Sequence, residues 1–438
     1  SWEIQTGRKF IVLTNSPTEH TITAWGYPYN FLLLLPLVDG FGYEIDWGVE
    51  RNTYPNRTEL PNFRIITSLG KILRSWTLPE SKLGLIAIAE LIAVSAEEPE
   101  PEIALMIGNE VKRLYTNFSL LIQCNPQLYG QERYGQIALI YPMASAWYTT
   151  FPHPVIPNTC YIDFEGAYYL LEDSHYTVDI IVFGDNKWYT RTPTLSELSK
   201  YSAIVLSNAA YLTDDQVQLI IDYVKNGGTL IAIGDLGIYN EHGERVDRLK
   251  LEEMLEDTYE TKFGLYCTVH SYGNGQVIHI PENIAWRYFF DRLEYNPEAK
   301  ELLESFKSLI NSVYPNEIET DLPDRVNIIR YKNDEIGNMV FYLVNYDWDF
   351  QNKEPIKHHN IKFNFKLPSS LIDKEIEIKV YTGDYPEGKS LPFTRDGEWI
   401  KLELPEVAVL TVIECRIAKP KGKPMIISEP TVIEGQNI

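Results

Sequence analysis

The stretch SAIVLSNAAYLTDDQVQLIIDYVKNGGTLIAIGD, residues 202–235, decides the fold class. It holds two continuous apolar runs, SAIVLSN (202–208) and TLIAIGD (229–235). Uninterrupted apolar runs of this length are typical of strands that are buried on both faces of a sheet. The stretch therefore predicts two buried strands of an α/β domain.

A helix is expected between these two strands. Thr213 and Gln216 have the spacing of a capping box, which begins a helix, and Gly227-Gly228 ends it. Its apolar face would consist of Val217, Ile220, Ile221 and Val224. A strand, a helix and a strand in this order predict a parallel pair of strands with a covering helix.

Similar apolar runs lie on both sides of this stretch. They are IALIYP (137–142), VDIIVFG (178–184) and GQVIHIP (275–281). Together they predict a doubly wound α/β domain over residues 134–295. The glycine-bearing segment SYGNGQ (271–276) is interpreted as a hairpin turn.

The pattern changes after residue 295. Residues 296–315 predict a connecting helix within a linker over 296–323. From 324 to 418 short strands recur with turn residues between them, which predicts a β-sandwich, and 419–438 are expected to form a tail. The expected strands are NIIRYKN (327–333), NMVFYLVNY (338–346), HNIKFNFKL (359–367), EIEIKVYTG (375–383), EWIKLELP (398–405) and VAVLTVIEC (407–415).

The first 78 residues predict a strand, a helix, a strand and a second helix. The expected strands are 9–14 and YEIDW (43–47), and the expected helices are 30–42 and 61–76. Such units build parallel sheets. A connecting region over 79–133 follows, with IALMI (103–107) as a further strand candidate.

The composition opposes some classes of function, namely nucleic-acid binding and insertion into a membrane. A net charge of −22 over 438 residues opposes nucleic-acid binding, because phosphates would be repelled. The four cysteines show no CxxC spacing, which predicts buried, reduced thiols and a cytoplasmic location. The longest apolar run, 31–38, is too short to cross a bilayer.

The sequence offers little evidence for a nucleotide-binding site, a metal site or a nucleophilic active site. The sequence has neither a GxGxxG motif after a strand nor a P-loop, and His358-His359 is interpreted as surface polarity rather than a metal-ligand pair. The turn SNAAYLTDD (207–215) corresponds to the place where class I glutamine amidotransferases, which the α/β domain resembles, carry a catalytic cysteine. It has no cysteine and lacks the flanking glycines of a nucleophile elbow. We therefore expect this domain to be structural.

Acidic residues offer a different chemistry. A retaining glycosidase needs two carboxylates about 5–5.5 Å apart, one as nucleophile and one as acid/base. Glu3 lies in SWEIQTG (1–7), and the strand 43–47 ends in Asp46 and Trp47. From these residues alone, the favoured interpretation is that Glu3 is an acid of a frayed terminus and that Asp46 is an ordinary loop acid.

The order of domains resembles glycoside hydrolase families 35 and 42. The likeness rests on a barrel-like βαβα unit, an α/β domain without its cysteine, a β-sandwich, and the E-x-Q-x-G motif at Glu3. It implies the last βαβα of a (β/α)8 barrel over 1–78, with Glu3 as nucleophile after strand 7. Trp47 after strand 8 would line the sugar site, with Tyr43, Asp46 and Trp25 near it.

The length that follows Glu3 looks most like archaeal exo-β-D-glucosaminidases of family 35. The resemblance implies exo-acting hydrolysis of a β-linked oligosaccharide, such as a chitosan-type chain or a β-galactoside. It also implies no cofactor, no metal, no membrane or nucleic-acid partner, and assembly into a homo-oligomer. Barrel strands 1 to 6 and the acid/base have no counterpart in the sequence, so we expect an N-terminal barrel portion as another chain or segment.

Other interpretations remain open at this point. Asn109-Glu110 follows a strand candidate and has the residue pair of an acid/base, but a structural role at the start of the α/β region is favoured. A non-catalytic carbohydrate-binding or assembly protein would keep the same accessory domains. An active amidase-like α/β domain is disfavoured by the missing cysteine.

Overall fold

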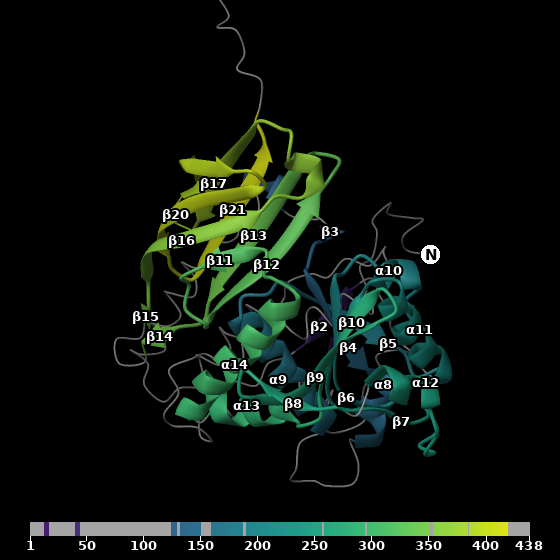
Figure 1. The fold of residues 1–438 in the computed structure, drawn as a ribbon. Coiled ribbons are helices and arrows are strands. Elements are labelled where there is room, and N and C mark those ends of the chain that lie inside the picture. The colour runs from purple at the N-terminus through teal and green to yellow at the C-terminus, as the bar shows by residue number, and fades with distance from the viewer. Residues whose placement is uncertain are drawn as a thin grey trace, which may run out of the picture.

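The computed structural model describes residues 13–16, 40–43, 124–128, 132–149, 159–186, 190–255, 258–293, 296–349, 354–383 and 385–418. Within these ranges the chain forms a mixed α/β sheet covered by helices and a pair of antiparallel sheets. Figure 1 shows the antiparallel sheets above the α/β sheet and its helices.

Two short parallel strands are described near the N-terminus. β1 (Leu13–Ser16) pairs with β2 (Gly40–Tyr43), so that Ser16 lies opposite Tyr43. The strand expected at 9–14 thus includes Leu13 and Thr14, and it runs further. The expectation of a helix to residue 42 is wrong at its end, because residues 40–42 are strand. The expected elements at 44–47, 61–76 and 103–107 lie outside the described residues.

The α/β sheet has seven strands in the order β5-β4-β6-β7-β10-β9-β8. The first five are mutually parallel, and β9 and β8 extend the sheet as an antiparallel edge. All five parallel strands were expected from the apolar runs, and β6 and β7 run further than expected. The strands are β4 (Ile137–Pro142), β5 (Val178–Phe183), β6 (Ala203–Tyr211), β7 (Thr229–Tyr239), β8 (Glu260–Lys262), β9 (Leu265–Tyr272) and β10 (Gly275–Ile280).

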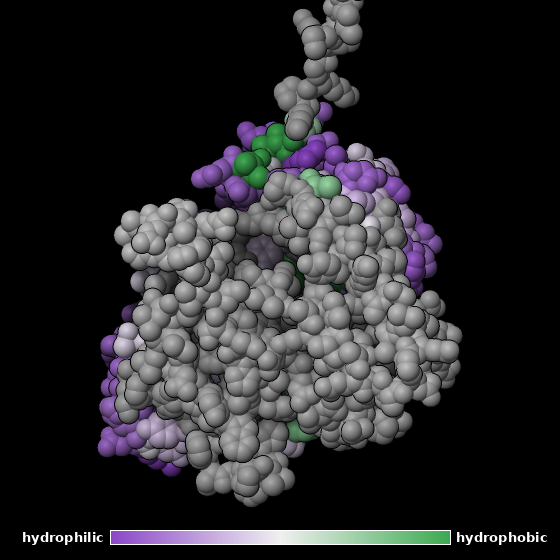
Figure 2. All heavy atoms as spheres, turned by 180° about the vertical axis from the view of Figure 1, so that it is seen from behind, coloured by the Kyte–Doolittle hydropathy of each residue, from purple (hydrophilic) through white to green (hydrophobic). Residues whose placement is uncertain are grey.

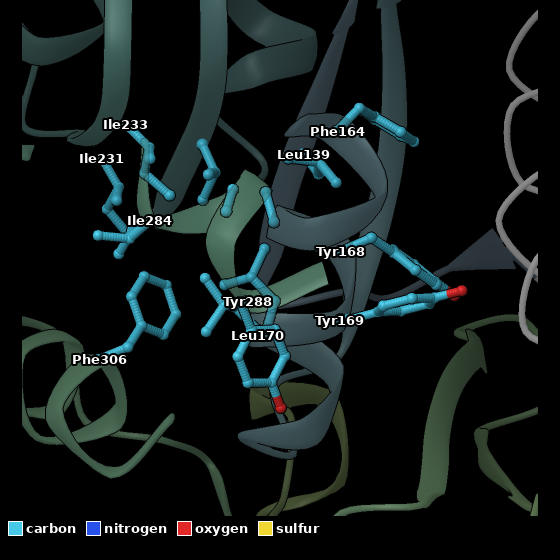
Figure 3. Packing of buried hydrophobic residues seen from close by; sticks show 14 of the residues in the cluster. Leu139, Phe164, Tyr168, Tyr169, Leu170, Ile231, Ile233, Ile284, Tyr288 and Phe306 are labelled. Carbon is cyan, nitrogen blue, oxygen red and sulfur yellow. The ribbon is translucent and has the colours of Figure 1, made fainter. Parts of the chain in front are cut away.

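Helices cover both faces of this sheet. α9 (Thr159–Asp173), α13 (Ile284–Leu293) and α14 (Pro297–Val313) bury one face, and their side chains converge with those of the strands in Figure 3. α10 (Leu195–Leu198), α11 (Asp214–Lys225) and α12 (Leu249–Leu255) bury the other. The short α8 (Met143–Thr149) follows β4 directly. A doubly wound arrangement is therefore confirmed.

The crossing of α9 and α13 depends on a glycine. A Cβ added to Gly166 of α9 would lie 1.9 Å from the backbone oxygen of Ala285 in α13. Real side chains do not approach a backbone atom so closely, so only glycine permits this contact. The contact brings α13 against α9 and sets the depth of this helical layer.

The capping box of α11 is confirmed. The Thr213 hydroxyl accepts a hydrogen bond from the Gln216 N–H, and the Gln216 side chain accepts one from the Thr213 N–H. The expected apolar face is buried. A second capping box, formed by Thr194 and Glu197 at α10, was not expected from the sequence.

The hairpin expected at 271–276 is also confirmed. β9 and β10 are joined by Gly273-Asn274, with Tyr272 opposite Gly275. Gly273 has a φ of 61°, in the left-handed region that two-residue hairpin turns require and that glycine adopts at little cost.

The segment predicted as a linker, 296–323, packs into both of the domains that it joins. Its helix α14 is not a free connection, because it contributes Leu302, Phe306 and Ile310 to the α/β core. The segment after it forms β11 (Ile318–Thr320), which pairs with a strand of the β-sandwich. Apolar periodicity predicted the helix but could not identify its packing partner.

Two antiparallel sheets form the β-sandwich, and their apolar faces meet in one core. All six strands that were expected are present, although Val407 ends β20 and does not begin the next strand. One sheet holds β11, β16 (His358–Lys366), β20 (Trp399–Val407) and β19 (Phe393–Asp396). The other holds β18 (Tyr385–Ser390), β17 (Ile376–Thr382), β21 (Leu410–Ile417), β13 (Asn338–Asn345), β12 (Val326–Asn333) and β3 (Glu132–Arg133). The short pair β14 (Trp348–Asp349) and β15 (Glu354–Pro355) lies outside both sheets.

The sandwich and the α/β unit are joined by polar contacts. β3 pairs with β12 immediately before the chain enters β4, and Arg133 donates a hydrogen bond to the Ile180 carbonyl of β5. Asn316 donates to the carbonyls of Ser174 and His175 at the end of α9. These bonds lie at the end of the α/β sheet opposite to the carboxyl ends of its parallel strands.

On the face that Figure 2 shows, most of the coloured atoms are hydrophilic, with a small hydrophobic patch among them. All four cysteines are free thiols, and three are buried as expected. Cys124 is exposed, so the expectation of burial is wrong for that residue. None of the described helices combines the length and the apolar content needed to cross a bilayer.

Candidate functional site

The predicted sugar-site residues lie almost entirely outside the described residues. Glu3, Trp25, Asp46 and Trp47 are in this group, and Tyr43 is the last residue of β2. The structure brings the ends of β1 and β2 together, because Ser16 and Tyr43 are register partners in a parallel pair. Asp46 and Trp47 follow β2 in the sequence, whereas Glu3 precedes β1, so the pairing of these two strands does not itself place Glu3 at the predicted site.

The histidine pair is divided between two different acids. His358 Nε2 lies 3.0 Å from Asp347 Oδ2, and His359 Nδ1 lies 3.8 Å from Glu406 Oε2. Within the described ranges no three His, Cys, Asp or Glu side chains lie close enough to hold a metal ion. These histidines therefore lie beside separate carboxylates and do not converge on one point.

The carboxyl edge of the α/β sheet is the place where a ligand is expected in this architecture. The strand order reverses at β4, which has β5 on one side and β6 on the other. In open α/β sheets, ligands bind beside the carboxyl ends of the strands at such a reversal. The side chains there come from β6, from the first turns of α9 and from the loop before α13.

One buried carboxylate joins these three elements. Asp163 of α9 accepts hydrogen bonds from Asn208 Nδ2 of β6 at 2.5 Å and from Asn283 Nδ2 at 2.7 Å. Asn283 in turn accepts from the Trp286 N–H at the start of α13. Burial raises the pKa of Asp163 to about 6, and the two amide donors partly offset this rise. With both oxygens occupied and no exposed surface, Asp163 holds elements together and does not present a general base.

The turn compared with amidotransferases contains no activated nucleophile. Asn208, in the bulge of β6, has a φ of 46°, a conformation that asparagine tolerates better than most residues. Ser207 is buried beside it and its hydroxyl has no hydrogen-bond partner among the described residues. Cys160 lies on α9, where burial and then the Asp163 carboxylate raise the pKa of its thiol. A buried neutral thiol is a poor nucleophile, which supports a structural role for this edge.

Three tyrosines form a second feature of the carboxyl edge. Tyr148 of α8, Tyr211 at the end of β6 and Tyr239 at the end of β7 stack on one another. This stack could not be predicted from the sequence, because its members are 63 and 28 residues apart and share no motif. Asp163 was missed for a related reason, since its position within a buried helix depends on the packing of α9 against α13.

No protein-family model matches the chain. No curated protein matches it in sequence either. Similarity is found among solved structures, where it extends over nearly the whole chain.

A β-galactosidase from Rahnella sp. R3 matches with a TM-score of 0.53 and 15% identity, over 92% of this chain and 63% of that one. The α-L-fucosidase isoenzyme 2 from Paenibacillus thiaminolyticus matches with a TM-score of 0.52 and 11% identity, over 91% of this chain and 64% of that one. The fold is therefore similar to that of glycoside hydrolases of the β-galactosidase and α-L-fucosidase kind. The chain spans less than two thirds of the length of either structure.

Proposed function

We propose that this chain carries the C-terminal part of a retaining exo-β-glycosidase and supplies its nucleophile, Glu3. The observation that carries the proposal is the fold similarity, which covers 92% of this chain but 63% of a β-galactosidase. The sugar would be a β-galactoside or a β-linked glucosaminide of the chitosan and chitobiose type. The division into a barrel part over 1–78, an amidotransferase-like α/β domain and a β-sandwich is part of this proposal.

The described start of the chain supports a barrel part. β1 and β2 are parallel, and the residues between them, 17–39, exceed the dozen or so that a parallel crossover needs. Parallel strands joined by such crossovers are the repeating unit of a (β/α)8 barrel. The remaining barrel strands would come from another segment or chain.

The reaction has two steps. A Glu3 oxygen attacks the anomeric carbon and forms a glycosyl ester while the glycosidic C–O bond breaks, and an acid on the remaining barrel strands protonates the leaving oxygen. That residue, now a carboxylate, takes a proton from water, which hydrolyses the ester and frees Glu3. Trp47 would lie against the sugar, with Tyr43, Asp46 and Trp25 near the non-reducing end.

Activity after combination with the N-terminal barrel portion tests the proposal. The purified parts are mixed and assayed with aryl β-galactosides and aryl β-glucosaminides. We expect Glu3→Gln to lower kcat by about 10³-fold or more, because no covalent intermediate can form. Glu110→Gln is the matched control, since the same change is made at the acid that has a structural role in this account.

The controls separate the possible outcomes. Full activity of Glu3→Gln with loss of activity in Glu110→Gln would overturn the nucleophile assignment. Sugar binding by a chain that is inactive with every barrel partner would instead favour a non-catalytic carbohydrate-binding protein.

A further inference from the structure

The three tyrosines at the carboxyl edge form a regular row. The ring centroids of Tyr148 and Tyr211 lie 4.7 Å apart with planes 9° apart, and those of Tyr211 and Tyr239 lie 4.8 Å apart with planes 18° apart. Tyr148 is 42% exposed, and the other two rings are half-buried. Nearly parallel rings at this spacing present one edge of each ring in sequence along the row.

The row is held by the backbone of the elements that carry it. The Ser145 hydroxyl of α8 donates to the Tyr211 carbonyl at 3.1 Å and accepts from the Tyr211 N–H at 2.9 Å. The Leu212 N–H donates to the Tyr239 carbonyl, which fixes β6 against β7 beside the rings. Side chains whose backbones are fixed in this way lose little freedom when they bind a ligand.

The face of Tyr148 is covered by a turn. A Cβ added at Gly243 would lie 2.8 Å from Tyr148 Cε1, so the backbone of this glycine packs on the ring. Stacking covers both faces of Tyr211 and one face each of Tyr148 and Tyr239, so ring edges and hydroxyl groups are what the row as a whole offers a ligand. The pKa of Tyr211 is raised by burial and then by Tyr239 and Tyr148.

These hydroxyls differ from those of the buried tyrosines. Tyr176, Tyr201, Tyr223, Tyr288 and Tyr381 each donate a hydrogen bond from the hydroxyl to a carbonyl, amide or carboxylate oxygen of the chain. Within the described residues, the hydroxyls of Tyr148, Tyr211 and Tyr239 have no such partner. As far as the described residues are concerned, these hydroxyls therefore remain as donors and acceptors for a further partner.

We propose that Tyr148, Tyr211 and Tyr239 form an accessory binding site for a β-linked oligosaccharide. A phenol ring offers an apolar edge and a hydroxyl together, which matches the alternating C–H and O–H groups of a sugar. The row lies at the carboxyl edge of the sheet, close to the strand-order reversal where ligands bind in this architecture. The net charge of −22 opposes an anionic ligand.

The choice of ligand class rests on the function proposed above, whereas the geometry of the row does not. The site would be distinct from the sugar site at Glu3, because its residues come from α8, β6 and β7. Its role would be to hold an oligosaccharide chain, with no bond made or broken.

Binding to the chain with Glu3→Gln tests the proposal. β-1,4-galactotetraose and a chitosan tetramer are titrated by calorimetry into this chain and into a variant that also carries Tyr148→Phe, Tyr211→Phe and Tyr239→Phe. Phenylalanine keeps the stacked rings and removes the three hydroxyls, so we expect at least about tenfold weaker binding of whichever tetramer binds. Tyr266→Phe is the matched control, because Tyr266 is 47% exposed and stacks on Tyr259 but lies on β9.

The outcomes are distinct from those of the activity assay. Binding that is unchanged in the triple variant, or an absence of binding of both tetramers, overturns the accessory site even if the assembled enzyme is active. Loss of binding in the triple variant supports the site even if the assembled enzyme is inactive. Should the triple variant unfold, Tyr148→Phe alone is used, with an expected weakening of about threefold against no change for Tyr266→Phe.

Discussion

The α/β unit and the β-sandwich bury charge in different ways. Helix α9 alone carries four buried acids, Asp163, Glu165, Glu172 and Asp173. Three of them accept hydrogen bonds from neighbouring elements: Asp163 from β6 and the start of α13, Glu172 from β12, and Asp173 from α13. The core between the two antiparallel sheets is apolar, with Phe341, Phe363 and Phe365 at its centre.

The elements of the two regions are therefore held in place by different interactions. In the α/β unit the carboxylates of one helix set the relative positions of the helices and strands around it. In the sandwich the positions follow from the packing of side chains from the two sheets, and the buried acid Glu414 lies outside that core. The α/β unit should therefore be sensitive to loss of a charge partner and to pH, and the sandwich much less so.

Removal of one arginine from each region should give the largest difference in stability between the two regions. Arg292 Nε donates to Asp173 Oδ2 at 2.5 Å, and the two side chains are 10% and 0% exposed. Arg292→Met leaves the Asp173 carboxylate buried with less compensation, which should lower the free energy of unfolding by about 3–5 kcal/mol. In the sandwich, Arg416→Met should cost about 2 kcal/mol, because Arg416 is 19% exposed and its hydrogen bond to Glu414 is longer, at 3.2 Å.

Urea unfolding of both variants measures the difference. Arg191→Met is a control, since Arg191 and Glu197 form an ion pair in which both side chains are more than a third exposed. We expect it to stay within about 0.5 kcal/mol of the unchanged chain. Equal losses for Arg292→Met and Arg416→Met would show that α9 does not depend on its charge partners.

One glycine in each region tests how sensitive that region is to an added side-chain atom. Gly166→Ala should cost about 3 kcal/mol, because the new Cβ would meet the Ala285 carbonyl oxygen and force α9 and α13 apart. In the sandwich, a Cβ added at Gly397 would meet no atom within 4 Å, and only its φ of 61° is unfavourable for alanine. Gly397→Ala should therefore cost about 1 kcal/mol. Thermal unfolding of the two variants measures the contrast, and a larger loss at Gly397 would contradict the close contact.

The pH dependence of stability gives a smaller and more specific effect. The pKa of Asp163 is raised from 3.8 to about 6, so between these values the folded chain keeps a proton that the unfolded chain has lost. The stability associated with the protonated form is therefore complete below pH 3.8 and is lost as pH rises through 6. The free energy of unfolding that Asp163 contributes changes by at most about 3 kcal/mol between these two pH limits.

Asp163→Asn should remove this fall in stability. Unfolding free energies measured at intervals from pH 4 to pH 7 should decline less in the variant than in the unchanged chain. Asp396→Asn is a suitable control, because Asp396 is an exposed acid of the sandwich whose pKa is lowered by Lys401. Parallel curves for Asp163→Asn and the unchanged chain would show that Asp163 does not titrate in this range.

Much of the fold could be predicted because its signals are local. The strands β4, β5, β6, β7 and β10 are continuous apolar runs, since both faces of the parallel sheet are covered. The capping box of α11 and the Gly273 turn lie within a few residues of the elements they end. The role of α14 and the pairing of β3 with β12 could not be predicted, because both depend on partners distant in sequence.

The site is harder to predict for the same reason. Asp163, Asn208 and Asn283 come from three separate elements, and none of them lies in a recognisable motif. The tyrosine row has the same character. By contrast, the proposal of Glu3 as nucleophile rests on a short motif and a domain order, both of which can be read along the chain.

Trapping of the covalent intermediate tests the central proposal most directly. The chain is combined with its N-terminal barrel portion and incubated with an activated 2-deoxy-2-fluoro-β-glycoside, which slows hydrolysis of the glycosyl ester, and the labelled residue is identified by peptide mass spectrometry. We expect a fluoroglycosyl group on Glu3 and no label in the Glu3→Gln variant. A label on Glu110, or on any residue other than Glu3, would contradict it.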